Sequence, residues 1–218
     1  MQKNDSERPL ILVTNDDGIH ASGLRELVEV MQFFGDVVVI SSEVSMSGKA
    51  SSITVDYPLR AVQVEKIHGV PTFKCNGTPV DCVKLSFNNL LERSPDYVVS
   101  GINHGSNASI SVIYSGTMGA AIEGSLHGVP SIGFSLDDYE SKADFSACGG
   151  FIKEISTKVL KEGLSSGICL NVNIPAVPKE DIKGVRICRQ AKARWVEQYE
   201  ERADPRSRNY YWLTDLPG

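Results

Sequence analysis

Along its first 175 residues the chain alternates short strand-like runs with helix-like segments. The runs LILVT at 10–14 and DVVVIS at 36–41 are strongly apolar, and residues 23–34 between them carry apolar side chains at helical spacing. The other strand-like runs are 96–100, 130–136 and 168–174, with shorter β-branched stretches near 53–55 and 61–65. The other helix-like segments are 78–91, 116–127 and 145–162. This alternation predicts parallel βαβ units, and therefore an α/β fold with a mostly parallel sheet and helices on both faces.

The regular pattern weakens after Pro175. Residues 176–218 are rich in charge and tyrosine, and they contain at most two or three strand-like runs. A chain of 218 residues is long enough to bury a substantial core. We therefore expect one α/β core over residues 1–175 and an irregular extension over 176–218. The extension would pack on the core or on another subunit and is not expected to be an independent domain.

The composition excludes several classes of protein. A formal net charge of −5 argues against stable DNA or RNA binding, because phosphate backbones select for basic surfaces. The start, MQKNDSERPL, lacks the apolar region of a secretory signal, and no run reaches the ~18 apolar residues of a membrane-spanning helix. The five cysteines are scattered and contain no CxxC pair, which indicates free thiols and no structural zinc site. We expect a cytoplasmic protein.

Polar residues gather where the predicted strands end. The segments Asn15–Gly18, Ser45–Gly48 and Gly101–Asn107 each follow a strand, and Ser115–Thr117 opens a helix. Parallel α/β sheets bind their ligands beyond the carboxyl ends of the strands. The sequence therefore predicts one site built from these four segments.

The adjacent carboxylates of Asp16 and Asp17 repel each other, so either a solvated turn or a bound cation must compensate. Taken alone, the Asp-Asp-Gly segment is typical of a polar turn. Together with the hydroxyl and amide oxygens of the neighbouring loops it forms an oxygen-rich set that suits Mg²⁺ or Mn²⁺ better than Zn²⁺. We favour the cation site.

The segment Ser115-Gly116-Thr117 suits phosphate, because a helix N-terminus presents free N–H groups and a positive dipole end. The alternative for this segment is a simple helix N-cap. His104 in the preceding loop has two interpretations, as a general acid or phosphate ligand and as an ordinary surface histidine.

Other phosphate-handling architectures do not fit. A Walker A motif ending at Lys49 fails because Glu43 stands where glycine is needed and Ala50 stands where serine or threonine is needed. No GxGxxG follows the first strand. Asn15 occupies the position of the nucleophilic aspartate of haloacid-dehalogenase-like phosphatases, and asparagine is a poor nucleophile. The strand-like run at 96–100 ends in Gly-Ile-Asn, without the phosphorylatable aspartate of a receiver domain.

The collected motifs resemble the SurE family (survival protein E), metal-dependent nucleoside monophosphate phosphatases. The matching segments are TNDDGIHASG at 14–23, Ser-x-Ser-Gly at 45–48, GTPVDCVKL at 77–85, VVSGINHGSN at 98–107, YSGTMGAAIEG at 114–124 and LNVNIP at 170–175. They occur in the family's order, and the resemblance covers roughly residues 10–213.

The resemblance implies a Rossmann-like core and one divalent cation per subunit (Mg²⁺, Mn²⁺ or Co²⁺). Carried across, the metal ligands are Asp16, Asp17, Ser47 and Asn103, and Asn107, Ser115, Gly116 and Thr117 lie around the phosphate. We expect catalysis by Asp16, Asp17 and Asn107, and substrate binding by Ser115, Gly116, Thr117 and His104. The family provides no role for His104, which sits where its members vary.

The implied activity is 5′-nucleotidase, with 3′-nucleotides and polyphosphate as further substrates. The family forms homodimers or homotetramers by exchanging C-terminal segments, which suits residues 176–218. The family usually carries a further C-terminal strand that has no counterpart in residues 1–218, so the resemblance implies no contacts from that strand here.

We expect direct attack of water on phosphorus, with Asp16 or Asp17 accepting the proton of the water. The alternative from another class is a nucleotide-binding module that uses the cation only to hold phosphate.

Overall fold

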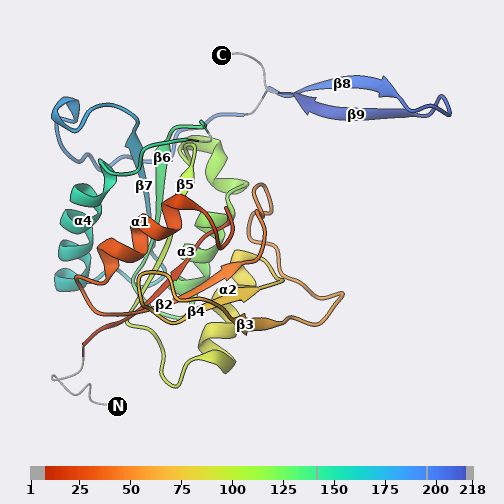
Figure 1. Cartoon of the computed structure of the whole chain (residues 1–218). Coiled ribbons are helices and arrows are strands. Elements are labelled where there is room, and N and C mark those ends of the chain that lie inside the picture. The colour runs from red at the N-terminus through yellow and green to blue at the C-terminus, as the bar shows by residue number, and fades with distance from the viewer. Residues whose placement is uncertain (1–7, 141, 195, 215–218) are drawn as a thin grey trace.

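The computed structural model describes residues 8–140, 142–194 and 196–214, and its main feature is a seven-stranded sheet (Figure 1). The strand order is β3-β4-β2-β1-β5-β6-β7, and every neighbouring pair is parallel except β3 with β4. The strands are β1 (Leu10–Thr14), β2 (Asp36–Ser42), β3 (Ala61–Gln63), β4 (Thr72–Cys75), β5 (Tyr97–His104), β6 (Ser131–Asp137) and β7 (Leu170–Pro175). The mostly parallel α/β fold expected from the sequence is confirmed.

Helices cover both faces of the sheet (Figure 1). The apolar side chains of α1 (Ser22–Met31) and α4 (Cys148–Glu162) pack on one face. Those of α2 (Pro79–Leu85) and α3 (Gly116–Leu126) pack on the other. Shorter helical turns are a π-helix at Ser86–Leu90 and 3₁₀ turns at Ser109–Ile113 and Lys179–Asp181.

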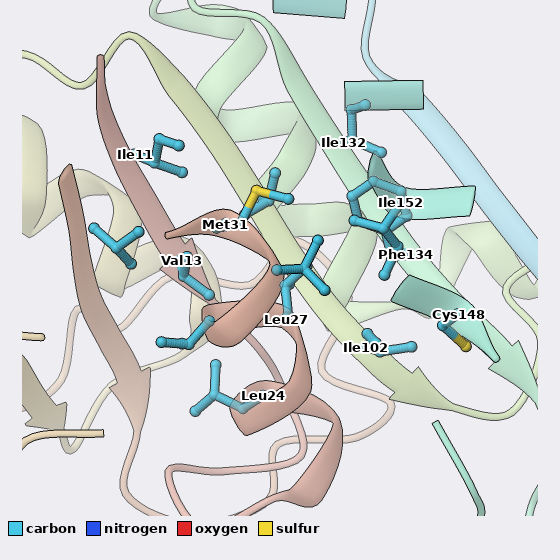
Figure 2. Close-up of a cluster of buried hydrophobic side chains, with 14 of the residues drawn as sticks. Ile11, Val13, Leu24, Leu27, Met31, Ile102, Ile132, Phe134, Cys148 and Ile152 are labelled. Atoms are coloured by element: carbon cyan, nitrogen blue, oxygen red, sulfur yellow. The ribbon is translucent and has the colours of Figure 1, made fainter. Parts of the chain in front are cut away.

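The larger core lies between the sheet and the pair α1 and α4 (Figure 2). Apolar residues recur along α1 at helical spacing and point toward the central strands, which are buried on both faces. The labelled side chains are Leu24, Leu27 and Met31 of α1, Ile11 and Val13 of β1, Ile102 of β5, Ile132 and Phe134 of β6, and Cys148 and Ile152 of α4. This rigid layer fixes the carboxyl ends of β1 and β5.

The chain changes direction at the centre of the sheet. From β1 it runs to β2 and β4 on one side, and then it returns to β5, β6 and β7 on the other side. In doubly wound sheets ligands bind outside the carboxyl ends of the strands at such a switch point. Here the switch point lies between β1 and β5, whose carboxyl ends lead into residues 15–18 and 105–107.

Several local predictions were wrong. Strand β5 extends to His104 past an irregularity between Ser100 and Asn103, so Asn103 and His104 lie in a strand and not in the predicted loop. The β-branched stretch at 53–55 does not form a strand. Strand β4, which the sequence did not predict, forms because it pairs with β2, a segment distant in the chain. The predicted helix over 78–91 is the short α2 followed by the π-helix.

Residues 198–214 form a two-stranded hairpin apart from the main sheet (Figure 1). Its strands are β8 (Gln198–Ala203) and β9 (Asn209–Thr214), which pair antiparallel. Among the described residues, no helix has the length and apolar character needed to cross a membrane.

Candidate active site

Asp16 lies at the centre of the candidate site, at the carboxyl end of β1, and it is 3% exposed. The Thr117 hydroxyl, from the start of α3, donates a short hydrogen bond to Asp16 Oδ1. Burial raises the pKa of the Asp16 carboxyl, and the bond from Thr117 partly opposes this shift. Burial thus disfavours the ionised form of Asp16, and a bound cation would favour it.

Asn103 presents a fixed oxygen atom to the same place. Its amide nitrogen donates to the carbonyl oxygens of His104 and Gly105, at 3.0 and 2.8 Å. This fixes the amide orientation and turns Oδ1 toward the Thr117 hydroxyl, 3.3 Å away. One hydroxyl thus links the oxygen atoms of Asp16, which follows β1, and of Asn103, which lies in β5.

Asp17 follows Asp16 directly in the chain and is only partly buried. The backbone N–H of His104 donates to Asp17 Oδ2 at 3.1 Å, which ties the end of β1 to the end of β5. Burial and, next, the neighbouring Asp16 charge raise the pKa of Asp17 to about 6.

Ser47 belongs to an exposed loop that contacts the backbone of Asp16. The backbone N–H of Met46 donates to the Asp16 carbonyl oxygen at 2.7 Å. The Ser47 hydroxyl itself contacts the Ser45 hydroxyl at 3.0 Å. The structure therefore brings the loop that carries Ser47 to the aspartates, and the side chain remains solvent-exposed.

The N-terminus of α3 lies against the Asp16 side chain. Ser115 is the N-cap, and its hydroxyl accepts from the Met118 N–H at 3.1 Å. A Cβ at Gly116 would lie 2.8 Å from the Asp16 Cβ and 2.9 Å from Asp16 Oδ2. Only glycine lets the helix start approach the carboxylate this closely.

Asn107 and His104 lie on different sides of the β5 end. The Asn107 side chain is buried, and its amide nitrogen donates to the Ser135 hydroxyl at 2.8 Å. The His104 ring packs edge-on against Phe145, with ring centroids 4.8 Å apart. The structure thus packs His104 toward the segment before α4, whereas Asn103 faces α3.

Sequence reasoning assigned no role in the site to two residues that shape it. Asn15 bridges the turn, because its amide donates to the Gly18 carbonyl at 3.0 Å while its Oδ1 accepts from the Ser41 hydroxyl at 2.5 Å. Asn173 Oδ1 of β7 accepts from the Asn107 backbone N–H and from the Ser106 hydroxyl. For Asn173, the sequence offered one signal, the two asparagines of Leu-Asn-Val-Asn at 170–173. Polar side chains in a strand beside a buried sheet need hydrogen-bond partners, which indicates that these asparagines bind a neighbouring segment.

The donor set fits a hard divalent cation. Three side chains bring oxygen atoms to one edge of the sheet: the carboxylates of Asp16 and Asp17 and the amide of Asn103. The loop that carries Ser47 lies beside them. Oxygen ligands of this kind suit Mg²⁺ or Mn²⁺. Among the described residues no three His, Cys, Asp or Glu side chains cluster, so a cation here depends on amide and hydroxyl oxygens as well.

Known proteins match the chain across this whole region. The family described as "Survival protein SurE" matches residues 11–197, which include every candidate site residue. The 5′-nucleotidase SurE of Cytophaga hutchinsonii is 53% identical over 207 residues, which cover 94% of this chain and 80% of that protein. The 5′-nucleotidase SurE of Christiangramia forsetii is 51% identical over 212 residues, covering 96% and 82%. The crystal structure of the SurE protein from Aquifex aeolicus superposes with a TM-score of 0.80 at 37% identity, covering 94% of this chain and 82% of that one.

Proposed function

This chain belongs to the SurE family and is a 5′-nucleotidase, and we propose that it uses one divalent cation at the Asp16 site. The observation that carries this proposal is the junction at Thr117, whose hydroxyl joins the oxygens of Asp16 and Asn103 at the start of α3. Asp16, Asp17, Ser47 and Asn103 would hold the cation. A bound cation would neutralise phosphoryl charge and help to activate a water molecule.

The start of α3 is suited to receive the phosphate. Its N–H groups carry the positive end of the helix dipole, and Gly116 keeps the approach free of a side chain. Donors fixed in this way stabilise charge that grows on phosphoryl oxygens in the transition state. In our proposal Ser115, Gly116, Thr117 and Asn107 surround the phosphate.

Asp17 is the better placed of the two carboxylates to accept a proton from water. Asp16 is almost completely buried and engaged by Thr117, whereas Asp17 is partly exposed and accepts from the His104 N–H. A general base must be within reach of the water whose proton it takes. We therefore propose that Asp17 orients the attacking water and takes its proton.

The test uses Asp16→Asn and Asp17→Asn. Phosphate release from AMP and GMP is expected to fall at least a hundredfold in both, which is the scale lost when a base or a fixed charge is removed. EDTA is expected to abolish release by the unmodified chain, and Mg²⁺, Mn²⁺ or Co²⁺ to restore it. Full activity of both variants, or activity unaffected by EDTA, would place catalysis elsewhere.

The same assay, run with 3′-nucleotides and polyphosphate, tests the wider substrate range that we propose. Nucleotide binding without phosphate release would support the non-catalytic alternative. The cytoplasmic location favoured by the sequence stays a prediction, which localisation of a tagged chain would check.

We propose that residues 176–218 join subunits into a homodimer or homotetramer. The hairpin β8–β9 projects from the body of the chain, and Trp212 on it is 58% exposed (Figure 1). Tyr199, Tyr211 and Leu213 are also exposed there. A lone two-stranded hairpin is marginally stable in water, so apolar residues on it favour packing against another subunit. Analytical ultracentrifugation would show a monomer if the proposal is wrong.

A further inference from the structure

The edge strand β7 is bonded to the loop that carries Asn107. Asn173 Oδ1 accepts from the backbone N–H of Asn107 at 2.8 Å and from the Ser106 hydroxyl at 3.2 Å. Asn171, two residues earlier and on the same side of the strand, donates its amide to the Asn107 carbonyl oxygen at 2.8 Å. Both polar backbone groups of Asn107 are therefore held by β7.

The amide of Asn173 has a fixed orientation. Its Nδ2 donates to Asn171 Oδ1 at 3.0 Å, so its Oδ1 faces the loop. An asparagine suits this position because it donates along the strand and accepts from the loop at the same time. The pair Asn171–Asn173 thus acts as one unit.

The neighbouring strand holds the Asn107 side chain. Ser135 of β6 is the register partner of Asn173, and its hydroxyl accepts from Asn107 Nδ2 at 2.8 Å. A primary amide has two hydrogens, so Nδ2 has one more hydrogen than its bond to Ser135 uses, and the proposed function assigns that hydrogen to a phosphoryl oxygen. Two adjacent strands therefore set both the backbone and the side chain of one candidate catalytic residue.

From this geometry we propose that Asn173, supported by Asn171, is a positioning residue that fixes Asn107 for phosphate hydrolysis. The inference rests on the proposed function, because Asn107 acts on the phosphate only if the site is catalytic. A displacement of about 1 Å at a reacting centre costs up to ~100-fold in rate. The hydrogen bonds that hold Asn107 in place are therefore expected to affect kcat.

The first experiment compares steady-state kinetics on AMP. Asn173→Leu keeps the size of the side chain and removes both polar atoms, so kcat is expected to fall roughly 10- to 100-fold with little change in KM. Asn173→Asp keeps the acceptor for the loop but loses the donor to Asn171 Oδ1, so its kcat is expected to lie between those of Asn173→Leu and the unmodified chain. Val172→Ala is the matched control, because it loosens the same strand from the opposite face and should leave kcat unchanged.

A double-mutant cycle separates positioning from general damage. If Asn173 acts through Asn107, Asn173→Leu is expected to have almost no further effect on kcat in an Asn107→Ala background. Equal losses of kcat in both backgrounds would overturn the inference, and so would an unchanged kcat in Asn173→Leu alone. An unmodified chain that releases no phosphate from any nucleotide would instead overturn the proposed function itself.

Hydrogen exchange gives a readout without turnover. The Asn107 backbone N–H should be protected in the unmodified chain and in Asn173→Asp, and it should exchange at least tenfold faster in Asn173→Leu. Equal protection in all three proteins would show that Asn173 does not hold the loop.

Discussion

Replacing Asp17 with asparagine is expected to stabilise the cation-free protein while it abolishes activity. Asp17 lies beside the buried Asp16, and burial together with that charge raises its pKa from an ordinary 3.8 to about 6. Each pKa unit corresponds to about 1.4 kcal/mol, so an ionised Asp17 destabilises the fold by about 2–3 kcal/mol near pH 8. Asparagine has a similar shape, still accepts from the His104 N–H and carries no charge.

The sign of the pH dependence follows from the raised pKa. The folded protein binds the Asp17 proton more tightly than the unfolded chain does, so the associated stability is present below about pH 4. It is lost as the pH rises toward about 6. The advantage of Asp17→Asn is therefore expected to be absent near pH 4, to grow up to about pH 6, and to stay constant above it.

Thermal unfolding in EDTA measures this difference. For a chain of this size 2–3 kcal/mol corresponds to a Tm increase of roughly 5–10 °C at pH 8. Mn²⁺ is expected to raise the Tm of the unmodified protein by mass action and to have little effect on Asp17→Asn.

Asp144→Asn is the control for a general effect of charge removal. Asp144 is an exposed carboxyl whose pKa is lowered by the N–H of Ser146, so its replacement should bring no gain in Tm. An Asp17→Asn protein that is no more stable than the unmodified chain in EDTA at pH 8 would refute the reasoning about burial and charge at this site.

The remaining predictions concern the helix start, the core and the hairpin. Gly116→Ala is expected to reduce kcat on AMP at least tenfold, since its Cβ would lie 2.8 Å from the Asp16 Cβ, and unchanged kinetics would contradict this close approach. Phe134→Ala should lower the free energy of unfolding in urea by about 3–5 kcal/mol, because Phe134 is completely buried. Trp212→Ser should shift sedimentation toward smaller species if the hairpin joins subunits, and an unaltered distribution would argue against that role.

The elements that the sequence identified well are those governed by local patterns. The apolar runs that became β1 and β2 and the spacing of Leu24, Leu27 and Met31 predict buried strands and an amphipathic helix directly. Strand β4 escaped prediction because it is short and is stabilised by pairing with β2, which no local window contains. The end of β5 escaped for a similar reason, since Asn103 and His104 pair with β6 beyond an irregular step.

By itself, the sequence determined the alternation of strands and helices, the polar segments that follow the strands, and the family to which those motifs belong. Only the tertiary structure decided which polar residues meet. Thr117 reaches Asp16 across 101 residues of chain, and Asn173 reaches Asn107 across 66, because the strand order places β1, β5, β6 and β7 side by side. The raised pKa of Asp16 comes from burial, and that of Asp17 comes from burial and, next, from the neighbouring Asp16 charge; burial is a property of the folded chain and of no segment alone.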